Sequence, residues 1–112
     1  MVDITRDVYL LLKKLAAVQL QFPDTKAVLP VITLCEVSNT GDFYIDGKEI
    51  TSQITIQVDV WDKKPEKSKE LSKKVDEIMA KNRYQRTLGR SFKDENGLYR
   101  TMMYYKLQTI NF

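Results

Sequence analysis

Carboxylates are the side chains in this sequence with the clearest capacity for chemistry. Asp59 and Asp62 lie near each other in sequence, but a catalytic acid–base pair needs two environments that separate its pKa values, and no such contrast is visible around them. Asp42, Asp46 and Glu49 offer the oxygen ligands that Ca²⁺ prefers, but their spacing matches no EF-hand loop and is better explained by turn formation. We therefore predict no catalytic and no metal-binding residues.

Histidine and cysteine usage narrows the possible chemistry further. The chain has no histidine and a single cysteine, Cys35. It therefore lacks the usual general base near neutral pH and the commonest metal ligand. A lone cysteine excludes an intrachain disulfide, and we expect Cys35 to be buried and inert in a strand. The four glycines are isolated and form no phosphate-binding loop. Together these features predict that the chain is not an enzyme and needs no cofactor.

Basic and aromatic side chains are interleaved near the C-terminus, where bases could stack and phosphates could be neutralised. No run of glycines and aromatics typical of an RNA-reading strand accompanies them, and the same segment must supply core residues. We expect no specific nucleic-acid binding and keep a small basic nucleic-acid-binding module as the alternative function. The residues concerned are Arg83, Tyr84, Arg86, Arg90, Phe92, Lys93, Tyr99 and Arg100.

Length and charge limit the architecture that carries these residues. The 112 residues suffice for one domain, 1–112, and no apolar run approaches the roughly 20 residues of a membrane helix. The net charge of +3 is concentrated in the second half of the chain. This asymmetry indicates either an acidic partner or one solvated, lysine-rich helix.

Periodicity predicts two helices and four strands. Apolar residues recur at spacings of three and four over 3–18 and 65–81, which indicates amphipathic helices. A strand is indicated over 50–61 by strict alternation and over 31–37 by β-branched residues. A hairpin of two further strands, 84–93 and 98–111, is indicated by the Asn96-Gly97 turn between them. The expected fold is α+β in the order α-β-β-α-β-β, with a mainly antiparallel sheet and both helices packed on one face.

Several large side chains lie where this fold needs no core residue. Tyr9 and Leu10 fall outside the apolar stripe of the first helix. Three more, Phe43, Tyr44 and Ile45, lie in a polar segment (38–48) expected to be a loop. Trp61 ends the 50–61 strand on its polar face. The last strand has large residues on both faces, so one face needs a cover that a subunit interface could supply. The candidate interface residues are Tyr9, Leu10, Phe43, Tyr44, Ile45, Trp61, Tyr99, Met103 and Tyr105.

Five segments give the chain a resemblance to a known protein class over roughly residues 4–108. The segments are Pro30-Val31-Ile32, Gln57-Val58-Asp59-Val60-Trp61-Asp62, Val75-Asp76-Glu77-Ile78-Met79, Gly97-Leu98-Tyr99-Arg100 and Met103-Tyr104-Tyr105. In this order the sequence resembles the small tail-completion proteins of tailed bacteriophages and prophages, also called tail-terminator or head–tail joining proteins.

The resemblance implies a structural protein without catalytic residues. Members of the class assemble as a ring, typically a hexamer, at the head-proximal end of the tail tube, where they stop tube polymerisation and receive the head connector. The implied partners are copies of the chain, the tail-tube protein and the head connector protein. The implied location is the virion, after assembly in the bacterial host cytoplasm. Whether this chain is the terminator or another connector component stays open.

Overall fold

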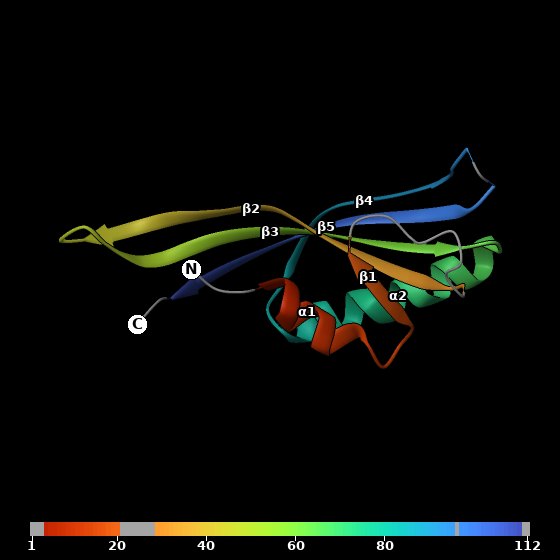
Figure 1. The fold of residues 1–112 in the computed structure, drawn as a ribbon, viewed down its shortest axis with the longest axis horizontal. Helices are drawn as coiled ribbons and strands as arrows, with labels where there is room; N and C mark the ends of the chain where they lie inside the picture. Colours follow the sequence, from red (N-terminus) through yellow and green to blue (C-terminus); the bar gives the residue numbers. More distant parts are fainter. Residues whose placement is uncertain (1–3, 21–28, 96, 111–112) are drawn as a thin grey trace.

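Five strands form a single sheet that two helices accompany on one side (Figure 1). The computed structural model describes residues 4–20, 29–95 and 97–110, with the side chains at 20, 39–43, 49, 52 and 108–110 left out of the description. The elements are α1 (Ile4–Leu12), β1 (Ala17–Leu20), β2 (Val31–Ile45), β3 (Lys48–Asp62), α2 (Pro65–Lys81), β4 (Gln85–Lys93) and β5 (Tyr99–Ile110). Positions 3 and 111 of the predicted elements and position 96 of the predicted turn lie outside the described residues.

The strand order in the sheet is β1-β2-β3-β5-β4. β1 and β2 are parallel, and every other neighbouring pair is antiparallel. The sheet therefore contains two hairpins, β2–β3 and β4–β5, which are joined where β3 pairs with β5 from Thr51↔Ile110 to Asp62↔Tyr99. The predicted α+β class with a mostly antiparallel sheet is confirmed.

One face of the sheet and the apolar stripes of both helices enclose a common hydrophobic core. The alternation in β3 places its aliphatic side chains on this face, as the sequence predicts, because a half-buried strand presents every second residue to the core. The core consists of Ile4, Val8 and Leu12 of α1, Ile32 and Leu34 of β2, Ile54, Ile56, Val58 and Val60 of β3, Leu71, Val75 and Met79 of α2, Tyr84, and Met103 and Tyr105 of β5.

The first helix is shorter than predicted, and a strand follows it. α1 ends at Leu12, and the 17–20 segment pairs in parallel with β2, with Ala17 opposite Val31. The order of elements is thus α-β-β-β-α-β-β. Leu15 and Val18, which the helical stripe includes, still pack against the core, so their burial is predicted correctly although their backbone conformation is not.

The segment 38–48 is a strand hairpin and not the predicted loop. β2 continues to Ile45 and β3 begins at Lys48, so only Asp46 and Gly47 form the turn. Their φ angles of 50° and 78° are the left-handed values of a type I′ hairpin turn, for which Asp-Gly is a preferred sequence. We call residues 37–53 the arm. It projects beyond both helices (Figure 1) and accounts for the elongated shape, with extents of 51 × 24 × 24 Å.

Cys35 is exposed and not buried as predicted. It lies on β2 next to the arm and pairs with Gln57 of β3 on the face opposite the core. The β-branched run around it predicts a buried strand, but only alternate residues of that strand face the core.

Candidate functional site

The arm carries large apolar side chains that its own subunit does not cover. Val37, Tyr44 and Ile45 are 52%, 56% and 52% exposed. Beyond Thr51, where the pairing with β5 ends, the arm has only two strands and no layer behind it, so neither face of this distal part can bury side chains within the subunit. The side chain of Phe43, the third apolar residue predicted here, lies outside the described side chains. We call Tyr44, Ile45 and Asp46 the arm tip.

A second exposed apolar surface lies on the β4–β5 hairpin. β4 is an edge strand, and all nine of its residues are exposed. Leu88, Arg90 and Phe92 alternate along it on the face opposite the core, and Leu88 and Arg90 are paired with the half-buried Tyr104 and Met102 of β5. We call these five residues the hairpin patch. The Arg90 guanidinium lies 5.9 Å from the centre of the Phe92 ring, which keeps a cation beside the apolar groups.

Between the patch and the middle of the sheet, Arg100 binds a buried carboxylate. Arg100 Nε and Nη2 donate to Asp59 Oδ2 at 3.2 and 2.6 Å, and Gln57 Nε2 donates to the same oxygen at 2.9 Å. The guanidinium also lies 4.6 Å from the centre of the Trp61 ring. Burial raises the pKa of Asp59, and the bonds from Arg100 and Gln57 offset this only in part. Arg100 is therefore engaged within the subunit.

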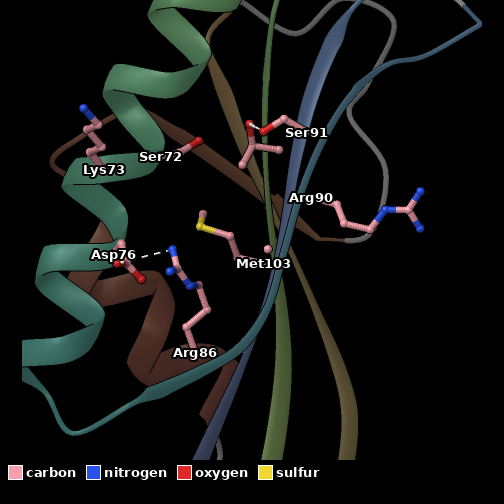
Figure 2. A pocket seen from close by; sticks show the side chains of 9 residues that line it. Ser72, Lys73, Asp76, Arg86, Arg90, Ser91 and Met103 are labelled. Carbon is pink, nitrogen blue, oxygen red and sulfur yellow. Dashed lines mark hydrogen bonds and ion pairs between the residues drawn. The ribbon is translucent and has the colours of Figure 1, made fainter.

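A pocket of about 320 Å³ lies between α2 and the β4–β5 hairpin. Figure 2 shows Asp76 and Arg86 facing each other at one end of it, while Arg90 points away from α2. Asp76 Oδ2 is 3.6 Å from Arg86 Nη1, and Asp76 Oδ1 accepts a hydrogen bond of 2.8 Å from the Tyr105 hydroxyl. Burial, together with the Asp76 carboxylate, raises the pKa of Tyr105.

Several polar groups at this pocket bind neighbouring protein groups, and the described residues form no nucleophile–base arrangement there. Thr101 Oγ1 lies 3.1 Å from Ser91 Oγ and 3.2 Å from Ser68 Oγ. Ser72 Oγ donates to the Ser68 carbonyl at 2.6 Å. In the part of the chain that the structure describes, no three Cys, Asp or Glu side chains gather in a way that could hold a metal ion.

The two carboxylates considered at first as an acid–base pair have separate structural partners. Asp59 binds Arg100, whereas Asp62 Oδ1 accepts a 2.7 Å hydrogen bond from the backbone N–H of Lys63, just before α2. No described helix has both the length and the apolar character of a membrane-spanning segment.

The structure places the candidate interface residues at three levels of burial. Four are well exposed in the subunit: Tyr9, Leu10, Tyr44 and Ile45. Tyr99 is half-buried. Trp61, Met103 and Tyr105, by contrast, are 4%, 2% and 0% exposed.

Trp61, Met103 and Tyr105, predicted as candidate interface residues, are therefore buried within the subunit. Met103 and Tyr105 lie on the core face of β5, where the Tyr105 hydroxyl is satisfied by Asp76. Trp61 is on the opposite face, but Arg100 stacks on its ring and its indole N–H donates to Thr33 Oγ1 at 2.9 Å.

Sequence reasoning missed Leu88 as an exposed apolar residue and treated Phe92 only as a possible base-stacking group. Both lie in the otherwise polar segment 85–93. Their spacing of four residues places them on one face of a strand, and this alternation is the signal that could have identified the patch.

Comparisons with known proteins add no relative to this geometry. No protein-family model matches the chain, and a search of the curated proteins gives no significant match.

Proposed function

We propose that this chain is a structural phage or prophage protein that acts at the head-proximal end of the tail, in tail completion and head–tail joining, by assembling as a ring. The observation that supports this most is the arm with its exposed apolar tip. Ordering a residue's backbone costs roughly 1–2 kcal/mol, and a two-stranded hairpin alone is marginally stable. Contacts outside the subunit would offset that cost, which gives the arm a role in assembly.

The proposal takes the α-β-β-α-β-β core, with both helices on one face, as the fold of the tail-completion class and β1 as an addition at the sheet edge. Its partners are copies of itself, the tail-tube protein and the head connector protein. Tyr9 and Leu10 on α1, about 43% and 46% exposed, offer a further contact surface. The role is structural, without catalysis, in the virion after assembly in the host cytoplasm.

Assembly on tail tubes tests this proposal. Tubes built from the tail-tube protein of the same phage or prophage are mixed with the wild-type chain and with Tyr44→Asp. We expect the wild type to form rings at tube ends and Tyr44→Asp to fold normally but fail to do so, because the added charge must be buried in the contact.

Ala80→Asp is the matched control, since Ala80 is exposed on α2 and the charge change is the same. It should complete tubes at the wild-type rate. A wild-type chain that neither binds tube ends nor associates with itself at high concentration would refute the proposal.

The alternative of nucleic-acid binding by the C-terminal hairpin is supported by the Arg90–Phe92 contact and weakened by two other contacts. Arg86 pairs with Asp76, and Arg100 pairs with the buried Asp59. Fluorescence anisotropy with labelled single-stranded DNA decides between the two functions. Micromolar binding that is lost steeply as salt rises would favour the alternative.

A further inference from the structure

The arm tip and the hairpin patch have complementary chemistry. The tip combines two exposed apolar side chains, Tyr44 and Ile45, with the exposed carboxylate of Asp46. The patch combines two exposed apolar side chains, Leu88 and Phe92, with an exposed guanidinium. Tyr44 and Ile45 are consecutive strand residues on opposite faces of the ribbon, so one of them, beside the Asp46 carboxylate, can cover the patch. The two surfaces thus offer apolar area to each other and carry charges of opposite sign.

The charges of the surrounding segments match this difference. By sequence, the arm (37–53) carries a net charge of −2, whereas β4 carries three cations and no acid. Cations on an edge strand prevent it from pairing with an identical edge. An acidic strand or turn meets no such repulsion.

The two surfaces cannot meet within one chain. The arm tip lies at one end of the 51 Å long axis, and the β4–β5 hairpin extends toward the other end (Figure 1). A contact between them must therefore join two copies, with the tip of one on the patch of the next. Such a contact uses two different surfaces, and its repetition closes a ring or extends a filament.

Building on the proposed function, we propose that the arm tip of one copy docks on the hairpin patch of the next copy, with Asp46 facing Arg90. Symmetric alternatives are disfavoured, because a tip-to-tip contact places carboxylates together and a patch-to-patch contact places guanidinium groups together. A phosphate backbone would engage Arg90 but leave Leu88 and Phe92 without an apolar partner, so a protein surface fits the patch better.

Charge exchange between the two surfaces tests this contact. Asp46→Lys and Arg90→Glu are made as single variants. The assembly of each variant, and of an equimolar mixture of the two, is followed by sedimentation velocity, with tail tubes added if the wild type needs them. We expect each single variant to raise the concentration for half-assembly at least 10-fold. An equimolar mixture of the two variants should return it to within about 3-fold of the wild type, because each reversed surface then meets its reversed partner.

Two further variants control for altered folding and for the change in total charge. Asp46→Asn keeps a residue that tolerates the left-handed turn conformation, and it should weaken assembly without changing the thermal unfolding of the subunit. Lys69→Glu makes the same charge change as Arg90→Glu at an exposed position on α2, and it should assemble like the wild type.

The outcomes separate the inference from the proposed function. Wild-type assembly that Asp46→Asn and Arg90→Glu leave unchanged overturns the docking contact while the structural function stands, and so does a two-fold dimer held by paired arms. Loss of DNA binding in Arg90→Glu, with assembly intact, assigns the patch to nucleic acid and also overturns the contact. A wild-type chain that never assembles, even on tubes, overturns both.

Discussion

Replacing Arg100 with methionine should strongly lower the free energy of unfolding, although Arg100 lies on the sheet face that no helix covers. The substitution keeps much of the side-chain volume but removes both hydrogen bonds to Asp59, whose side chain is only 4% exposed. Removing one member of a buried ion pair typically costs about 3–5 kcal/mol. Gln57 still donates to the stranded carboxylate, so the lower part of that range applies.

The loss of the Trp61 contact adds to this value. A cation stacked on a tryptophan ring contributes about 1 kcal/mol when partly desolvated, which brings the expected destabilisation to about 4 kcal/mol. With an unfolding entropy of about 2.1 cal/mol/K per residue, each kcal/mol lowers the Tm of a chain of 112 residues by roughly 4 °C. We therefore expect Tm to fall by roughly 15 °C.

Urea unfolding followed by fluorescence measures the effect directly, because Trp61 is the only tryptophan and lies against the guanidinium. Arg90→Met is the control, since the exposed Arg90 side chain contacts the Phe92 ring and binds no buried carboxylate, and it should cost no more than about 1 kcal/mol. In an Asp59→Asn background, Arg100→Met should cost about as little as the control.

The pH dependence has a definite sign. Asp59 has a raised pKa in the folded subunit, so its contribution to stability is fully present below its ordinary value of 3.8 and is lost as pH rises through the folded value. Removing Arg100 raises this pKa further, so the gap between wild type and Arg100→Met should narrow on acidification. A destabilisation no larger than that of Arg90→Met, or a gap that widens toward low pH, would refute the reasoning.

Two other predictions follow from the buried tyrosines and one from the exposed cysteine. Tyr105→Phe should lower the free energy of unfolding by about 1–2 kcal/mol, through loss of the bond to Asp76, whereas Tyr105→Asp should abolish cooperative unfolding; a normally folded Tyr105→Asp would contradict the core position. Burial, and then Asp7, raises the pKa of Tyr84 to about 12, so its contribution is full below 10 and is lost as pH rises through about 12. Relative to Tyr84→Phe, the wild type should therefore lose stability over that interval in alkaline urea titrations, and a parallel pH profile would count against this. Cys35 should react with a thiol-specific reagent in the folded subunit as fast as in the unfolded chain, and strong protection would show that the thiol is covered.

The sequence predicts correctly the helices and strands that bury one regular face. It predicts the wrong conformation where the same buried residues fit either a helix or a turn and a strand. Leu15 and Val18 fit the helical stripe that includes Leu12, yet they reach the core through a turn and β1. Apolar spacing records that these residues are buried, but the parallel pairing with β2 is a tertiary interaction that leaves no local periodicity.

In the arm and in β5, the apolar pattern of the sequence does not identify a buried face. Residues 38–45 show no apolar alternation in the sequence, so the sequence reveals the Asp46-Gly47 turn but not the strand that leads to it. β5 has large side chains on both faces, so its pattern cannot identify the inner one. Tyr105 can be buried in the core because its hydroxyl donates a hydrogen bond to Asp76. Asp76 lies on α2, which is remote from Tyr105 in sequence.

The pairing of β3 with β5 has a consequence for how the subunit forms. Each hairpin connects strands that are neighbours in sequence, whereas this central pairing joins Thr51 to Ile110 and Asp62 to Tyr99 across α2 and β4. Closing so long a loop is slow relative to forming a hairpin, and folds dominated by non-local pairing typically complete in milliseconds to seconds. The arm belongs to the first hairpin and the patch to the second. Their relative orientation therefore depends on this non-local pairing, and the proposed docking between copies requires that it has formed.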